Sequence, residues 1–131
     1  MTTHTKSLFQ VTAWDESPYD QAEGAPKLTR ATVTKTFSGA IEGSSSVEYL
    51  MTHRADDTAS FVGQERITGS LDGRAGSFVL EHIGTFQEGA AKATCAVVPG
   101  SGTGELESLR SSGRFDAASR EVRFRFDYDF D

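Results

Sequence analysis

Hydrophobic and polar residues alternate along most of this chain, and the clearest alternation surrounds the dipeptide Asp72-Gly73. Residues 61–86 read FVGQERITGSLDGRAGSFVLEHIGTF, with a β-like run on each side of that dipeptide. A two-residue type I′ turn needs positive φ at both central positions, which Asp-Gly tolerates. The pattern therefore predicts a β-hairpin with Asp72 and Gly73 at its tip.

The turn would set the register of the whole hairpin, with Leu71 opposite Arg74. Because side chains alternate between the two faces of a strand, one face would collect the pairs Ile67–Phe78, Glu65–Leu80, Gly63–His82 and Phe61–Gly84. That face is apolar apart from Glu65 and His82. These two lie diagonally across the hairpin, at a distance that long side chains can bridge.

The rest of the chain also has the composition of strands separated by turns, and it predicts one domain over residues 1–131. The further strands are expected at residues 8–14, 28–38, 47–53, 91–98, 110–115 and 121–130. Residues 1–6 are polar and are expected to be flexible. Residues 15–27 are expected to form a long loop, and residues 39–46 a bend, a bulge or a turn.

Residues 47–53 allow two registers against the first strand of the hairpin. In one, Glu48 lies opposite Glu65 on the inner face. A slip by one residue exchanges the two faces of a strand, and it would instead turn inward Val47, Tyr49 and Met51. The apolar content of the inner face favours the slipped register.

Eight strands at short spacing predict an antiparallel barrel or a sandwich. We favour an all-β, eight-stranded antiparallel barrel, because closure removes exposed strand edges. The interior of such a barrel is just wide enough for packed side chains or for one small ligand. The last strand would add an aromatic stripe that serves equally as core or as the wall of a ligand pocket, formed by Phe124, Phe126, Tyr128 and Phe130.

Composition narrows the classes of function. A net charge of −6 argues against nucleic acid and anionic membranes as partners. The single cysteine, Cys95, forms no disulfide within the chain, which is typical of a reducing compartment. No apolar run has the length of a membrane span, and the first residues lack the apolar segment of a signal peptide. We therefore expect a cytoplasmic protein.

Four stretches of the sequence carry a resemblance to a known family. They are Gly43-x-Ser-x-x-Glu48-Tyr49-Leu50-Met51, Phe61-Val62-Gly63-x-Glu65, Gly73-Arg74-x-Gly76-Ser77-Phe78-Val79-Leu80-x-His82 and Val98-Pro99-Gly100-Ser101-Gly102-Thr103-Gly104-x-Leu106. Together they resemble a bacterial family of small proteins of unknown function with an allene oxide cyclase-like barrel. The glycine turn is also similar to that of plant allene oxide cyclases and dirigent proteins. The resemblance implies an eight-stranded barrel with a central cavity, often oligomeric, and it implies no activity.

Glu65 and His82 are the candidate catalytic residues. An apolar cavity would raise the pKa of the Glu65 carboxyl, and a nearby imidazole could exchange its proton. Gly63 would leave space beside the imidazole. Such a pair could act as acid and base in the isomerisation or cyclisation of an apolar substrate. The alternative is a buried pair that is hydrogen-bonded for structural reasons alone, as buried polar groups must be.

The candidate ligand-binding residues belong to the same expected interior. They are Glu48, Phe61, Phe78, Leu80, Phe124, Phe126 and Tyr128. Glu48 would add a second carboxylate beside Glu65 in the first of the two registers. Cys95 lies in an apolar run and is expected to be an inert core thiol. No metal site and no cofactor are predicted.

Three hypotheses for function follow. The first is a small-molecule-binding barrel with cyclase or isomerase activity on an apolar substrate. The second is a carrier that shares the cavity and needs neither acid nor base. The third is a structural or interaction protein with a filled barrel, in which Tyr49 and Met51 lie on an outer surface that forms a homo-oligomer. The expected partners are thus an apolar small molecule and further copies of the chain.

Overall fold

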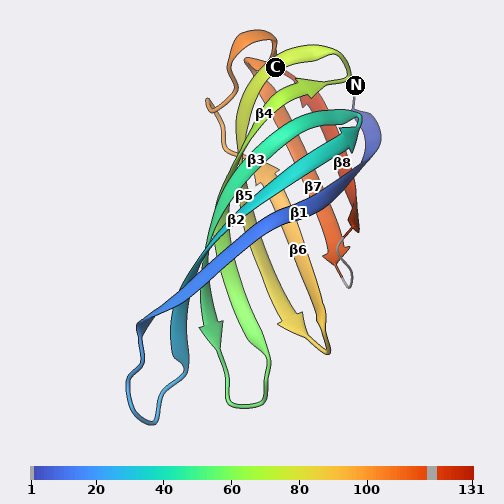
Figure 1. Ribbon diagram of the computed structural model, residues 1–131. Helices are drawn as coiled ribbons and strands as arrows, with labels where there is room; N and C mark the ends of the chain where they lie inside the picture. Colours follow the sequence, from blue (N-terminus) through green and yellow to red (C-terminus); the bar gives the residue numbers. More distant parts are fainter. Residues whose placement is uncertain (1, 118–120) are drawn as a thin grey trace.

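The computed structural model describes residues 2–117 and 121–131, in which eight antiparallel strands close into a barrel in sequential order (Figure 1). The strands are β1 (Thr3–Asp20), β2 (Lys27–Gly39), β3 (Ile41–His53), β4 (Ala59–Leu71), β5 (Arg74–Gln87), β6 (Ala90–Val97), β7 (Leu109–Ala117) and β8 (Glu121–Phe130). Each strand pairs with the next, and β8 pairs with β1. The predicted all-β, eight-stranded antiparallel barrel is therefore confirmed.

β4 and β5 form the central hairpin in the predicted register. All the inner-face pairs expected from the turn are present, among them His82 opposite Gly63. Asp72 and Gly73 have φ of 49° and 85°, the positive values that a type I′ turn needs at both central positions. The turn thus places Glu65 and His82 on the inner face.

β3 takes the slipped register of the two that the sequence allowed. Val47 pairs with Glu65 and Tyr49 with Gly63, and both Val47 and Tyr49 are buried inside the barrel. The pairing of Glu48 with Glu65 is wrong, because Glu48 lies on the outer face. When the apolar residues of β3 face inward, their surface is removed from water, and the carboxylate of Glu48 stays solvated.

Strand pairing extends into polar segments that were not predicted to belong to strands. Residues 3–6, expected to be flexible, pair with β8, and residues 15–20, expected to be a loop, pair with β2. Met1 lies outside the described residues. Residues 41–46, part of the segment 39–46 that was expected to form a bend, a bulge or a turn, belong to β3. Backbone hydrogen bonds hold these segments, so their polar side chains do not prevent pairing.

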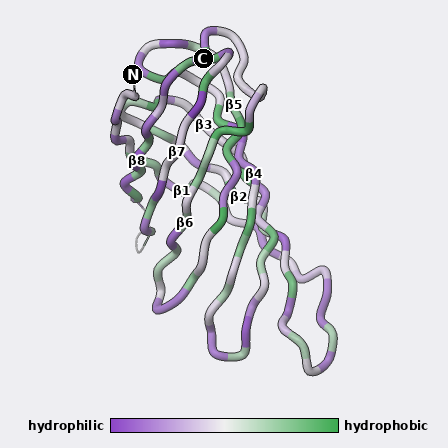
Figure 2. Tube along the Cα trace, turned by 180° about the vertical axis from the view of Figure 1, so that it is seen from behind, coloured by the Kyte–Doolittle hydropathy of each residue, from purple (hydrophilic) through white to green (hydrophobic). Residues whose placement is uncertain are grey.

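The long strands β1 to β4 extend past the ends of β6, β7 and β8 at one end of the barrel, which we call the mouth (Figure 1). The β1–β2 and β3–β4 loops lie at the tip of this extension, where Figure 2 shows mostly hydrophilic positions. The described pairing of β1 with β8 ends at Gln10. A register shift between Val11 and Ala13 then marks a bulge, and bulges bend and twist a strand. The mouth therefore has an inner face made mainly by the extended strands.

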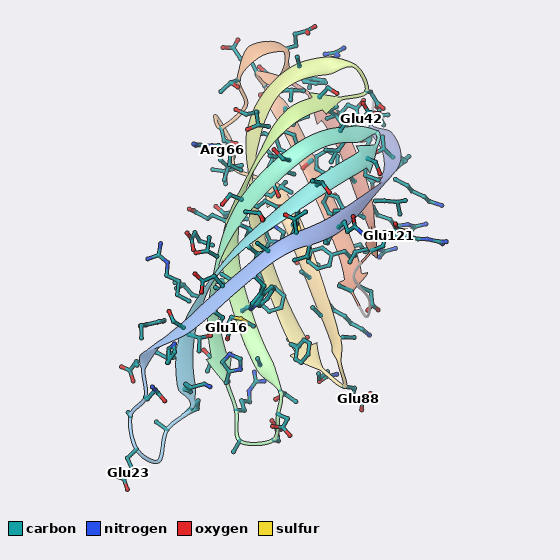
Figure 3. The ribbon with its side chains drawn as sticks, viewed as in Figure 1. Glu16, Glu23, Glu42, Arg66, Glu88 and Glu121 are labelled. Atoms are coloured by element: carbon teal, nitrogen blue, oxygen red, sulfur yellow. The ribbon has the colours of Figure 1, made fainter. Side chains whose placement is uncertain are left out.

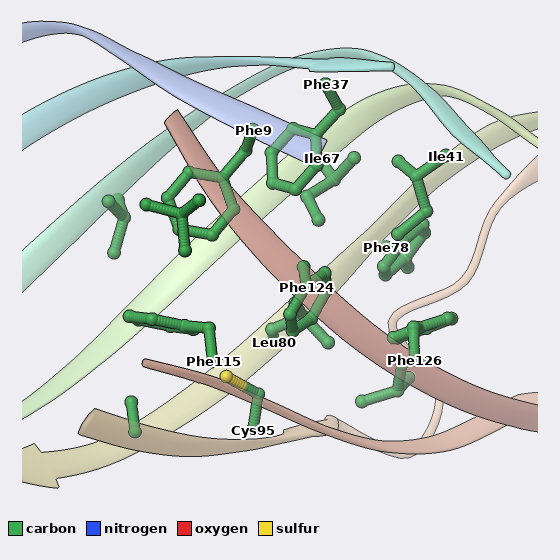
Figure 4. Packing of buried hydrophobic residues seen from close by; sticks show 14 of the residues in the cluster. Phe9, Phe37, Ile41, Ile67, Phe78, Leu80, Cys95, Phe115, Phe124 and Phe126 are labelled. Carbon is green, nitrogen blue, oxygen red and sulfur yellow. The ribbon is translucent and has the colours of Figure 1, made fainter. Parts of the chain in front are cut away.

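Aromatic rings fill the interior between the strands (Figure 4). Phe9 packs on Phe37 and Phe115 at centroid distances of 5.4 and 5.2 Å. Phe124 lies 5.6 Å from Phe126. These rings come from strands far apart in sequence, so their packing ties the two ends of the chain into one core.

The end opposite the mouth is closed. The 3-10 helix η1 (Gly104–Leu106) contributes Leu106, which is completely buried. The Tyr128 hydroxyl donates a hydrogen bond of 2.5 Å to Asp72 Oδ2, which ties β8 to the central turn. Among residues 2–117 and 121–131, no helix is long and apolar enough to cross a membrane.

Charged side chains cover the outside of the barrel, as Glu42, Arg66 and Glu121 illustrate in Figure 3. Lys35 and Glu65 depart from this rule, because only 3% and 1% of their surfaces are exposed. An isolated buried charge is costly unless it is paired and hydrogen-bonded. The interior must therefore contain a polar network.

Gly69 and Gly43 face each other across β4 and β3 with φ of 155° and 147°. A Cβ atom on Gly69 would lie 2.0 Å from the Glu42 carbonyl oxygen, whereas one on Gly73 would have open space. We expect Gly69→Ala to lower the free energy of unfolding by about 2–4 kcal/mol through strain and overpacking. Gly73→Ala, with strain alone, should cost about 1–2 kcal/mol. Urea unfolding measures both, and equal losses would contradict the close approach of β3 and β4.

Candidate functional site

A polar cluster lies inside the barrel, with one side chain from each of several neighbouring strands. Lys35 of β2 lies opposite Ser45 of β3, and His82 of β5 lies opposite Cys95 of β6. Glu65 of β4 lies between them. All five side chains point inward because each occupies the buried phase of its strand. Strand pairing alone therefore gathers the cluster.

The Glu65 carboxylate is held by three donors. His82 Nε2 lies 2.7 Å from Oε1, while Ser45 Oγ and Lys35 Nζ lie 2.5 and 3.5 Å from Oε2. Burial by itself would raise the pKa of Glu65, but the Lys35 ammonium and these hydrogen bonds lower that pKa to about 2. The expected rise in the pKa of Glu65 is wrong, because the expectation did not include a buried cation beside it.

His82 links Glu65 to Cys95. A carboxylate only accepts hydrogen bonds, so His82 Nε2 carries the proton in the contact with Glu65. His82 Nδ1 lies 3.2 Å from the Cys95 sulfur. Burial, together with the charge of Glu65, raises the pKa of Cys95 to about 12, so the sulfur keeps its proton and can donate it to Nδ1. A neutral imidazole satisfies all three groups, and Cys95 has the surroundings of an inert thiol.

Lys35 is surrounded by aromatic rings on the side of Glu65 that faces the mouth. Its Nζ is 4.2 Å from the ring centroid of Phe9 and 5.2 Å from that of Phe115, distances typical of cation–π contacts. The same nitrogen donates a hydrogen bond of 3.3 Å to the Tyr49 hydroxyl. The ammonium thus joins the Glu65 network to an aromatic region.

The Tyr49 ring occupies the space that Gly63 leaves. A Cβ atom on Gly63 would lie 2.5 Å from Tyr49 Cδ1. The ring also meets the His82 imidazole edge to face at 5.6 Å and the Phe61 ring at 5.1 Å. The absence of a side chain at Gly63 therefore makes room for Tyr49, and a substrate is not needed to fill this position.

A cavity of about 90 Å³ lies between this aromatic region and the mouth. Its walls include Met51 and Phe61, and its polar lining comes from Lys35 and Tyr49. Trp14 and Phe86 also line it and are 50% and 38% exposed, so the cavity reaches the surface at the mouth. Glu65 and His82 are not among the residues that line it.

Trp14 is held in place at the mouth by a second polar group. Its indole stacks on Tyr49 at 6.1 Å, and its Nε1 donates a hydrogen bond of 2.9 Å to Glu16. Glu16 also accepts from Thr29 at 2.7 Å and lies 2.8 Å from His53 Nε2. Burial would raise the pKa of Glu16, but the hydrogen bonds from Thr29 and Trp14 lower it.

Two larger depressions lie on the outside of the barrel. They measure about 720 and 740 Å³, and both are lined by Arg114 and Arg125 on the outer faces of β7 and β8. One of them includes Cys95 in its lining, and neither is lined by Lys35, Glu65 or His82. The smaller cavity at the mouth is the better candidate site because buried polar groups converge on it with apolar walls.

The candidate ligand-binding residues divide into four groups. Phe61 lines the cavity. Four others are buried in the packed core away from it, namely Phe78, Leu80, Phe124 and Phe126. Tyr128 lies at the closed end, bonded to Asp72. Glu48 lies on the outer face, where it accepts hydrogen bonds from Arg30 and Thr32. Glu48 therefore does not form a carboxylate pair with Glu65.

Lys35, Ser45 and Trp14 were not among the site residues predicted from the sequence. A signal for Lys35 was present, since Ala31, Val33 and Phe37 alternate with threonines and place Lys35 in the apolar phase. Ser45 and Trp14 have no comparable signal. Ser45 lies in the segment 39–46, for which no strand was predicted, and Trp14 is the last residue before the predicted loop 15–27.

The fold and the site together define a class: a small closed barrel with a buried ion pair and a cavity at one end. A family model for proteins of unknown function, DUF3224, matches residues 5–128, and the chain therefore belongs to this family. A solved structure of a DUF3224 protein of unknown function from Shewanella oneidensis MR-1 is similar to it, with 30% sequence identity and a TM-score of 0.84. That alignment covers 100% of this chain and 99% of the other. No curated protein matches the chain.

The Glu65 carboxyl should titrate far below its ordinary pKa of 4.5, near pH 2. Because folding lowers this pKa, the ionised carboxylate contributes stability that is fully present above pH 4.5 and is lost as the pH falls toward 2. The contribution is about 3 kcal/mol. The ¹³C shift of the Glu65 carboxyl, assigned by its absence in Glu65→Gln, measures the midpoint. If acid unfolds the protein first, titration and unfolding should coincide. A midpoint at or above 4.5 in the folded protein would contradict the network.

Proposed function

We propose that this protein binds a small apolar molecule in the cavity at the mouth of the barrel. The observation that carries the proposal is an apolar cavity that reaches the surface and has the buried ammonium of Lys35 at its inner end. Concave apolar sites with a few converging polar groups are the usual form of small-molecule sites. Trp14 and Phe86 form its entrance.

The volume sets the size of the enclosed part of the ligand. A buried apolar cavity of roughly 150 Å³ accommodates benzene. The cavity of about 90 Å³ is smaller, so it can enclose one end of a molecule, and the remainder would lie along Trp14 and Phe86. A slim ligand fits this arrangement better than a bulky one.

Binding is better supported than catalysis by Glu65 and His82. The rings of Tyr49 and Phe115 pack on His82 and also line the cavity, so a bound molecule meets these rings before the imidazole. A carboxyl with a pKa of about 2 is also a poor proton donor at neutral pH. We assign the pair to the positioning of Lys35. Cyclase or isomerase activity stays a prediction, as does the relationship to allene oxide cyclases.

A homo-oligomer and a cytoplasmic location also stay predictions. The outer surface proposed for assembly is wrong in its residues, because Tyr49 and Met51 are buried inside the barrel. Three exposed apolar side chains do lie side by side across β3, β4 and β5 on the outer face, namely Leu50, Val62 and Ile83. A contact between copies of the chain would use this row.

Filling the cavity should abolish binding without disturbing the fold. Ala91 lines the cavity, and Ala96 on the same strand is exposed on the outer face. We expect Ala91→Leu to weaken the binding of toluene by more than about tenfold through overpacking, and Ala96→Leu to leave it unchanged. Trp14 is the only tryptophan of the chain, so its fluorescence reports occupancy directly.

The unfolding temperature of each leucine variant controls for the fold. Saturable binding to the natural chain and to Ala96→Leu alone would support the proposal. The absence of a saturable signal from the natural chain, or equal binding by Ala91→Leu, would overturn it.

A further inference from the structure

The cavity contains hydrogen-bond donors that protein groups do not use fully. The Lys35 ammonium has three N–H donors, and its polar contacts are with the Tyr49 hydroxyl at 3.3 Å and Glu65 at 3.5 Å. The Tyr49 oxygen accepts from Lys35, and its own proton meets no acceptor among the described residues. Both side chains are more than nine-tenths buried, and both line the cavity. An acceptor placed there would satisfy both of them.

The charge of the interior limits what that acceptor can be. Lys35 and Glu65 carry opposite charges, and an imidazole that donates to Glu65 and accepts from the Cys95 thiol adds none. An anionic ligand would leave a buried negative charge without a partner, which costs several kcal/mol. A neutral acceptor adds no charge. The cavity therefore favours an uncharged ligand.

The hydrogen-bond donors and acceptors of the cavity also limit the functional group of the ligand. A hydroxyl or a primary amide brings its own donor, and the cavity walls of Met51 and Phe61 offer it only the weak acceptor of the Met51 thioether. A ketone, aldehyde or ester oxygen accepts two hydrogen bonds and donates none. Burial, together with the charge of Glu65, raises the pKa of Tyr49 well above its ordinary value, so the phenol keeps the proton that it would donate.

We propose that Lys35 Nζ and the Tyr49 hydroxyl jointly hold the carbonyl oxygen of an uncharged, slim apolar ketone, aldehyde or ester at the inner end of the cavity. The inference rests on the proposed function and adds the chemical class of the ligand. The apolar remainder of the bound molecule lies between Met51 and Phe61 and extends to the surface beside Trp14.

Three probes of similar size separate the alternatives by titration calorimetry: acetophenone with a neutral carbonyl, ethylbenzene without an acceptor, and benzoate with a negative charge. We expect acetophenone to bind more tightly than ethylbenzene by at least about fivefold, since a single hydrogen bond is worth that much. Tyr49→Phe should reduce this preference about fivefold to tenfold and leave the affinity for ethylbenzene unchanged.

Tyr128→Phe is the matched control, because Tyr128 bonds to Asp72 at the closed end of the barrel. It should keep the preference for acetophenone. The infrared carbonyl stretch of bound acetophenone gives a readout that needs no variant, and two donors should lower its frequency relative to acetophenone in hexane.

Each outcome decides between the claims. Equal affinities for acetophenone and ethylbenzene, an unshifted carbonyl stretch, or tighter binding of benzoate would overturn the carbonyl site and leave the proposed function intact. If none of the three probes binds, both the carbonyl site and the proposed function fail.

Discussion

Lys35 and Glu65 place opposite charges 3.5 Å apart inside the barrel, where each is almost completely buried. Removing two ions from water costs several kcal/mol for each, and only good geometry with further hydrogen bonds offsets that cost. Here His82 and Ser45 supply the further bonds to the carboxylate. The requirement connects β2, β3, β4 and β5 from the inside. It also sets the protonation of Glu65 and the charge that a ligand would meet.

The glycines opposite the large rings complement this network. Gly63 makes room for Tyr49, and a Cβ atom on Gly84 would lie 2.4 Å from Phe61 Cζ. An eight-stranded barrel has an interior just wide enough for side chains, so rings over glycines can fill it almost fully. The small cavity at the mouth is lined by Val11 and Trp14, which lie beyond the described pairing of β1 with β8. Its polar lining is thus a consequence of how the ion pair and the rings are packed.

Strand pairing was the part of the structure most accessible to sequence reasoning. Asp72-Gly73 fixed the φ values of the turn, and the period of two then carried Glu65 and His82 to the inner face. β1 was harder, because the backbone bonds that hold its polar ends leave no trace in side-chain hydrophobicity. Alternation within β2 did mark Lys35 as inward, but a lysine in an apolar phase usually signals a solvated face.

The chemistry of Glu65 depended on that one residue. Burial considered alone predicts a raised carboxyl pKa, as desolvation gives for an isolated acid, and Lys35 is the largest of the groups that lower it. The partner of a buried charge lies on another strand, so its identity follows only from the register of both strands. The cavity was inaccessible for the same reason, because its volume is the small difference between the space enclosed by eight strands and the side chains that fill it.

The most direct test of this account is a double-mutant cycle on the free energy of unfolding, with Lys35→Met and Glu65→Leu. Either change alone leaves a buried charge without its partner and should lower the free energy of unfolding by about 3–5 kcal/mol. The loss in the double variant should be at least about 3 kcal/mol smaller than the sum of the losses in the two single variants. The exposed pair of Arg30 and Glu48, at 3.3 Å between β2 and β3, is the control and should show a coupling below about 1 kcal/mol. Additive costs at Lys35 and Glu65, within about 0.5 kcal/mol, would contradict the central place of the ion pair.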